Sequence, residues 1–185
     1  MSSVILTNER GEKIGLAEST DAHKGLGLLH QAFSVYVFRS RGEELLLQRR
    51  AEEKRLFSGL WTNTCCSHVK PVPVHVTPSS SESLIETAER RLQEEMGFSC
   101  PLLTAGSFVY RAEDPHGNGA EHEYDTVLVG ILDDADVHAH PAEVSDWKWI
   151  HIADLTEELE RSPDLFTPWF AQGLGIAQEH LCTHA

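Results

Sequence analysis

Hydrophobic residues along the chain fall mostly into short alternating or continuous runs that predict β-strands. Turn-forming segments such as "ERGE", "RSRGE" and "EDPHGNG" separate these runs. The strands expected on this basis cover residues 4–8, 13–17, 31–38, 44–50, 102–112, 121–132 and 146–152. Residues 70–81 carry three prolines and three serines, so we expect a loop there.

One segment has the spacing of an amphipathic helix. Residues 82–97, "ESLIETAERRLQEEMG", repeat apolar side chains at helical intervals, and Gly97 provides a stop signal. Two further helices are expected, from about Asp154 and from about Pro168. Strands outnumber helices, and neither a repeat nor a strong linker interrupts them, so the pattern predicts a single α+β domain over residues 1–185.

Composition narrows the class of protein. Apolar and charged contents of 41% and 24% are ordinary for a soluble domain of 185 residues. A net charge of −14 disfavours a nucleic-acid partner, because phosphate backbones need a basic surface. No run is long enough to span a bilayer, the first twenty residues lack a signal-peptide core, and the four cysteines make a poor disulfide framework. These features predict a cytoplasmic protein without a membrane partner.

A local basic cluster runs against the overall acidity. "LLLQRRAEEKR" contains Arg49, Arg50, Lys54 and Arg55. The cluster is either an anion site, which would suit a small phosphorylated substrate, or a solvated turn after a strand.

Several pairs of residues have spacings that suit metal binding. Glu121 and Glu123 lie two apart on a predicted strand, so both carboxylates project to one face. His23 and His30 flank a glycine-containing segment that disfavours an unbroken helix, so a loop would bring them together. Exposed glutamates and solvated histidines are the alternative interpretation.

"WTNTCCSHVKP", residues 61–71, contains two adjacent cysteines. On a strand, Cys66 shares a face with Thr64 and His68, while Cys65 shares the opposite face with Asn63 and Ser67. The spacing does not suit a zinc finger or a CxxC redox site.

The helix 82–97 is similar to the Nudix box, in which adjacent carboxylates hold a hard divalent cation that in turn holds a diphosphate. The matching positions are Glu82, Arg90, Leu92, Glu94, Glu95, Gly97 and Phe98. Two positions depart from the pattern: Val76 replaces the first glycine, and Arg91 replaces the first glutamate of the box core. A solvated acidic helix is the alternative.

Taken together, the motifs resemble the type I isopentenyl-diphosphate isomerases of the Nudix superfamily. The resemblance extends from about His23 to Trp169 and rests on "AHKGLGLLHQAF", "QRRAEEKRLFSGLWTNTCCSH", "RRLQEEMG", "FVYRAEDPHG", "EHEYD" and "TPWF". It implies a Nudix-like mixed β-sheet sandwiched by helices, with strands in residues 1–20 and helices in residues 153–180 packing on the domain. It also implies a monomer or weak dimer.

The resemblance implies two metal sites and a diphosphate clamp. A divalent ion (manganese, magnesium or zinc) would be bound by His23, His30, His68, Glu121 and Glu123. Glu95 would hold a magnesium ion that bridges the substrate diphosphate. Arg50, Lys54 and Arg91 would contact the diphosphate oxygens.

The implied reaction converts isopentenyl diphosphate into dimethylallyl diphosphate, a step of isoprenoid biosynthesis, through a tertiary carbocation. Cys66 and Glu123 would carry out the two proton transfers, with Glu123 as the donor and Cys66 as the acceptor. Tyr110 would hydrogen-bond near Glu123, and the ring of Trp169 would stabilise the cation.

Two alternatives remain: a Nudix pyrophosphohydrolase of a nucleoside or prenyl diphosphate, and a non-catalytic diphosphate-binding module. Three departures from the family pattern are present. Ser19 stands where a lysine is usual, Val69 follows the metal histidine in place of proline, and the loop 70–81 is longer than in compact bacterial members.

Overall fold

The structure is a computed structural model that describes residues 3–71 and 83–184. The elements along the chain are β1 (Ser3–Thr7), β2 (Lys13–Glu18), α1 (Ser19–Ala22), β3 (His30–Arg39), η1 (Ser40–Gly42), β4 (Glu44–Arg50), β5 (Trp61–Thr62), β6 (Cys65–His68), α2 (Leu84–Met96), β7 (Leu103–Glu113), β8 (Ala120–Ile131), β9 (Val144–His151), α3 (Ile152–Arg161), η3 (Pro163–Leu165) and α4 (Phe170–His184).

The nine strands of the described residues form one mixed sheet organised around β3. β8 runs parallel to β3 along almost its whole length, and β7 pairs antiparallel with β8. The other edge of β3 is shared by β1, β6 and β4. β2 extends the sheet beyond β1, and both β5 and β9 pair with β4. β3 therefore brings segments from every part of the chain into register.

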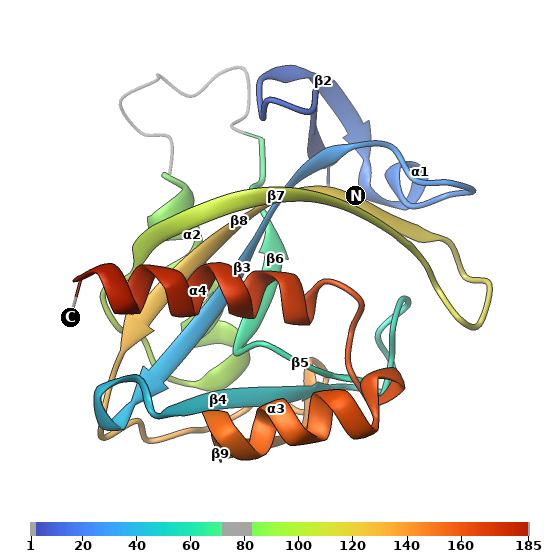
Figure 1. Ribbon diagram of the computed structural model, residues 1–185. Helices are drawn as coiled ribbons and strands as arrows, with labels where there is room; N and C mark the ends of the chain where they lie inside the picture. Colours follow the sequence, from blue (N-terminus) through green and yellow to red (C-terminus); the bar gives the residue numbers. More distant parts are fainter. Residues whose placement is uncertain (1–2, 72–82, 185) are drawn as a thin grey trace.

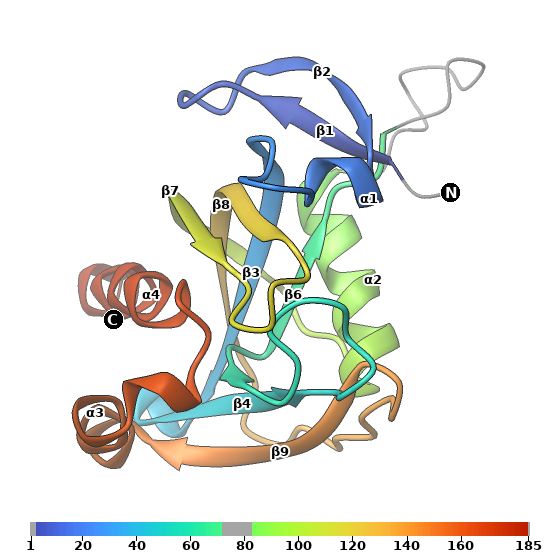
Figure 2. The same ribbon diagram turned by 90° about the vertical axis from the view of Figure 1, so that its right-hand side faces the viewer.

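Helices α2 and α4 cover opposite faces of the sheet (Figures 1 and 2). Side chains alternate along β3, so Phe33, Val35 and Val37 belong to the core on the α2 side. Tyr36 and Phe38 belong to the core on the α4 side. Apolar side chains are therefore buried on both faces of the sheet, and the fold has three layers: α2, the sheet and α4. The predicted α+β fold, a mixed sheet sandwiched by helices, is confirmed.

Local signals explain the ends of α2. Ser83 caps its N-terminus in a capping box with Glu86, and Gly97 ends it with a left-handed φ of 81°. The two later helices begin at Ile152 and Phe170, close to the predicted positions. The predicted loop from residue 72 onward, including Val76, and the Nudix-box Glu82 lie outside the described residues. None of the helices in the described ranges has the length and apolarity needed to cross a membrane.

Candidate functional site

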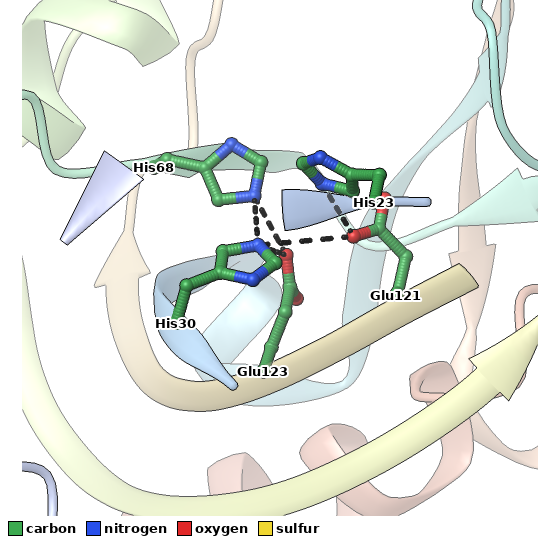
Figure 3. Close-up of side chains that lie close together, drawn as sticks. All are labelled: His23, His30, His68, Glu121 and Glu123. Atoms are coloured by element: carbon green, nitrogen blue, oxygen red, sulfur yellow. Dashed lines mark hydrogen bonds and ion pairs between the residues drawn. The ribbon is translucent and has the colours of Figure 1, made fainter. Parts of the chain in front are cut away.

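Five potential metal ligands converge from four separate segments of the chain (Figure 3). Their candidate ligand atoms all lie within 4.8 Å of one another. The residues are His23, which follows α1, His30 at the start of β3, His68 at the end of β6, and Glu121 and Glu123 on β8. This is the set of residues expected at the first metal site, and the structure brings all of it together.

The sheet register explains why these residues meet. The parallel pairing of β3 with β8 places His30 directly opposite Glu123, and the antiparallel pairing with β6 places His68 opposite Ala32. The loop that carries His23 is joined to the start of β8, because Ala120 N–H donates to the His23 carbonyl at 2.9 Å.

The backbone orients two of the imidazoles toward the cluster. His23 Nδ1 donates to the Ser19 carbonyl at 2.5 Å, and His30 Nδ1 donates to the Leu28 carbonyl at 2.7 Å. Each neutral ring therefore directs the lone pair of Nε2 inward, as in metal-binding histidines. Ser19, which replaces the lysine usual in the family, thus orients His23 through its main chain.

Short contacts link the ligand atoms. His23 Nε2 lies 2.9 Å from Glu121 Oε2, and His68 Nε2 lies 2.8 Å from Glu123 Oε1. The Nε2 atoms of His30 and His68 are 3.1 Å apart. Ring nitrogens and carboxylate oxygens at these separations are the kind of atoms that a shared cation would contact.

The carboxylates make the cluster favourable for positive charge. Burial lowers the pKa of His23, but the neighbouring Glu121 outweighs burial and the net pKa is raised. His30 shows the same balance of burial against Glu123, and its pKa is also raised. Three imidazole nitrogens and two carboxylates, four of the five side chains buried, therefore form a group that could hold a divalent metal ion.

A pocket of about 100 Å³ lies beside the metal cluster. Every residue lining it except Ser67 is a site candidate from the sequence. The lining residues are Arg50, Lys54, Cys66, Ser67, His68, Arg91, Tyr110, Glu121, Glu123 and Trp169. Glu95 does not line the pocket: it is buried behind Arg91, apart from the five-residue cluster.

The pocket contains the two expected proton-transfer groups. Tyr110 Oη donates to Glu123 Oε2 at 2.5 Å. Burial raises the pKa of the Cys66 thiol to about 12, so the thiol is protonated at neutral pH. Burial also raises the pKa of Glu123, but the adjacent imidazoles of His30 and His68 outweigh it, and the net pKa lies well below the ordinary value.

Two buried polar groups near Cys66 were missed by the sequence interpretation. Asn63 Oδ1 accepts hydrogen bonds from Cys66 Sγ at 3.2 Å and from Trp169 Nε1 at 3.3 Å. The expectation that Asn63 faces away from Cys66 was wrong, because β6 begins only at Cys65 and strand alternation does not extend to residue 63. Asp125 is fully buried and accepts from Ser34 Oγ at 2.7 Å. Its position two residues after Glu123 was an available signal.

The three candidate diphosphate ligands have different surroundings. Arg50 donates through Nε and Nη2 to the Leu56 carbonyl, and its guanidinium lies 5.7 Å from the Trp169 ring centroid. Arg91 and Lys54 are joined by a shared carboxylate, that of Glu143. Arg91 Nη2 also lies 2.5 Å from Glu95 Oε1. Glu143 was not among the candidates from sequence.

The chain is similar in sequence to a known family and to proteins with assigned names. The family model described as the NUDIX domain matches residues 28–170. Two proteins named isopentenyl-diphosphate Delta-isomerase are similar to the chain over most of their length. The one from Halorhodospira halophila is 42% identical over 170 residues, which cover 92% of this chain and 91% of its own. The one from Nocardia farcinica is 41% identical over 174 residues, covering 94% and 93%.

Solved structures share the fold at lower identity. DR0079 from Deinococcus radiodurans superposes with a TM-score of 0.61 at 19% identity, covering 86% of this chain and 90% of its own. The NUDIX domain of Shewanella oneidensis NrtR, complexed with ADP ribose, superposes with a TM-score of 0.58 at 20% identity, covering 89% and 94%. At these identities the two structures support the fold alone.

Proposed function

The chain belongs to the isopentenyl-diphosphate Delta-isomerases of the NUDIX family, and from this premise we infer that it converts isopentenyl diphosphate into dimethylallyl diphosphate. The reaction adds a proton to the terminal methylene carbon and removes one from the neighbouring methylene, so two proton-transfer groups must reach one small substrate. The observation that carries the assignment of residues is that Cys66 and Glu123 line the same pocket as Trp169.

We assign the two proton transfers to Cys66 and Glu123. At neutral pH the Cys66 thiol holds a proton, whereas the Glu123 carboxylate is ionised. In these resting states Cys66 carries a proton and Glu123 does not, so each group can take part in one of the two transfers. Asn63 would hold the thiol in place, and Tyr110 would hold the carboxylate through its hydrogen bond.

Trp169 is placed to stabilise the tertiary cation that follows protonation. Its ring lines the pocket and is fixed by Phe57 and Tyr110, whose centroids lie 5.2 and 5.4 Å away. A cation over an indole face in a desolvated pocket is stabilised by about 2 kcal/mol. The same aromatic walls keep water from capturing the intermediate.

The charged residues of the site have two roles in this proposal: some bind a metal ion, and the others bind the substrate diphosphate and its magnesium ion. His23, His30, His68, Glu121 and Glu123 would hold manganese, magnesium or zinc, and this ion would supply Lewis-acid polarisation beside Glu123. Glu95 would contact a magnesium ion carried by the diphosphate only after Arg91, which now pairs with it at the edge of the pocket, moves aside. Arg50, Lys54 and Arg91 would bind the diphosphate oxygens.

We place the protein in the cytoplasm as a monomer or weak dimer. The four cysteines are all unpaired, which fits a reducing compartment.

One assay separates this function from the alternatives. The protein is incubated with isopentenyl diphosphate and magnesium, with Cys66→Ala as the control. We expect dimethylallyl diphosphate from the unmodified protein only. Release of phosphate or pyrophosphate would instead indicate a hydrolase, and bound but unchanged substrate would indicate a binding module.

A further inference from the structure

Glu143 bridges two of the three cations assigned to the substrate diphosphate. Its Oε2 forms an ion pair with Lys54 Nζ, and its Oε1 lies 3.1 Å from Arg91 Nη2. Each carboxylate oxygen therefore contacts one cation. The three side chains are partly buried, at 26% exposure for Glu143, 25% for Lys54 and 17% for Arg91, so solvent screens these pairs only in part.

The main chain fixes Glu143 at this position. Its carbonyl accepts from Ala51 N–H at 3.0 Å, and its own N–H donates to the His140 carbonyl at 3.0 Å. Lys54 N–H in turn donates to the Ala51 carbonyl at 3.1 Å. The turn before β9 and the turn that carries Lys54 are thus joined, and Glu143 is held against the cations.

Three carboxylates, those of Glu94, Glu95 and Glu143, already pair with the Arg91 guanidinium, and within the described part of the chain only one of its nitrogen atoms lacks an acceptor. Its Nη2 is shared by Glu143 and Glu95, while its Nε is buried and has no hydrogen-bond partner among the described residues. A buried guanidinium N–H without an acceptor is costly, so an oxygen that reached Nε after a shift of the Arg91 side chain would be stabilised.

We propose that Glu143 occupies, in the free protein, the place of substrate phosphate oxygens on Lys54 and Arg91, and that its displacement by a diphosphate sets the preference for diphosphates over monophosphates. The inference rests on the proposed function. A carboxylate that bridges two cations imitates two oxygens of one phosphoryl group. A diphosphate brings more negative charge and more oxygens than a monophosphate, so it competes better for both cations and for Arg91 Nε.

Binding of inorganic pyrophosphate and orthophosphate, measured by calorimetry with magnesium present, tests the proposal without requiring catalysis. The variant Glu143→Gln keeps the shape of the side chain but removes its charge. We expect it to bind pyrophosphate about tenfold more tightly than the unmodified protein, because the internal competitor is weakened. Orthophosphate should gain more, so the preference for pyrophosphate narrows.

Glu44→Gln is the matched control, because Glu44 also pairs with an arginine, Arg39, but outside the pocket. It should leave both affinities unchanged. Glu143→Asp is a second variant whose shorter side chain retains the charge but reaches only one cation, so its gain in pyrophosphate affinity should be smaller.

Weaker or unchanged pyrophosphate binding in folded Glu143→Gln would overturn the inference and make Glu143 a residue that merely positions the cations. An unmodified protein that binds no pyrophosphate would overturn the diphosphate site of the proposed function, and the inference with it. The two failures are therefore distinguishable.

Discussion

Cys66 is joined to Asn63 by a hydrogen bond from its thiol to the amide oxygen at 3.2 Å, whereas the adjacent Cys65 is fully buried in the core on the α2 side. The two neighbouring thiols therefore lie on opposite faces of β6. One of them lines the pocket with Glu123, and the other packs like a small apolar side chain.

Replacing each cysteine with alanine should separate these roles. Cys65→Ala should lower the free energy of unfolding by about 1 kcal/mol and leave kcat nearly unchanged. Cys66→Ala should preserve the fold but reduce kcat at least about a hundredfold, because a proton-transfer group is lost. Thermal unfolding and steady-state kinetics measure both effects. An alkylating substrate analogue should label Cys66 and spare Cys65, and equal losses of activity in the two variants would refute the assignment.

Metal removal should inactivate the protein and lower its melting temperature, because the ion would connect the loop at His23 to three strands. His30→Ala should weaken metal binding, which can be followed by calorimetry on the stripped protein. His122→Ala is the control: this residue lies on β8 between the two ligand glutamates but is not in the cluster. Full activity in metal-free protein would contradict the prediction.

Gly119 should be required for metal binding, although it is not one of the five candidate ligands. It has a φ of 140°, and an added Cβ would overlap the His23 carbonyl oxygen. Gly119→Ala should therefore displace the His23 loop and reduce metal affinity. Gly117→Ala is the matched control: its φ is 76°, but an added Cβ would meet nothing within 4 Å. The control should lose about 1 kcal/mol of stability and keep its metal affinity. Equal metal affinities in the two variants would disprove the idea.

Arg91→Glu would restore the glutamate of the Nudix box, yet we expect it to impair the protein. The new carboxylate would face Glu94, Glu95 and Glu143, all of which now pair with Arg91. Pyrophosphate affinity and melting temperature should both fall, and no hydrolysis should appear. Efficient hydrolysis of nucleoside diphosphates by the variant would show that the departure from the box is not what separates this site from a hydrolase.

Ionisation of Asp114 should make the free energy of unfolding decrease as the pH falls into the acid range. Burial raises the pKa of Asp114, but hydrogen bonds from the N–H groups of Phe57, Asn118 and His116 outweigh it, and the net pKa is lowered. A carboxyl group whose pKa is lower in the folded state stabilises the fold above its unfolded pKa of about 3.9, and this contribution is lost as the pH falls further.

Asp114→Asn should therefore be less stable than the unmodified protein by about 2 kcal/mol at pH 7, with a difference that shrinks below about pH 4. Urea unfolding at a series of pH values measures this. A difference that stays constant down to pH 2 would exclude the ionised carboxylate as the cause.

Local periodicity was sufficient to predict seven of the nine strands in the described residues, α2, and the position of Glu121 and Glu123 on one face, but β5 and β6 are too short to give such a signal. It could not predict Asn63, because its contacts to Cys66 and Trp169 depend on an irregular connection between β5 and β6. The role of Glu143 was not predicted from the sequence for a related reason. Nothing in its neighbourhood along the chain indicates that it meets Lys54 and Arg91, which lie on other segments.

The predicted ligand set, in contrast, came from a family resemblance and not from spacing. His23, His30 and His68 belong to three segments, and their convergence depends on the pairing of β3 with β6 and β8 and on the hydrogen bond that joins the His23 loop to Ala120. Two glutamates separated by one residue on a strand can be recognised from the local sequence. Three histidines that meet only when the strands of a sheet pair cannot.

The parallel pairing of β3 with β8 also bears on how the chain acquires its site. Ser34 and Asp125, which are hydrogen-bonded across these strands, are 91 positions apart. Parallel strands cannot pair until the whole intervening segment has closed into a loop, and such long-range pairing is slow to nucleate. We therefore expect the metal-binding group to be completed late in folding. A bound ion would then act mainly as a brake on unfolding and contribute little to the speed of folding.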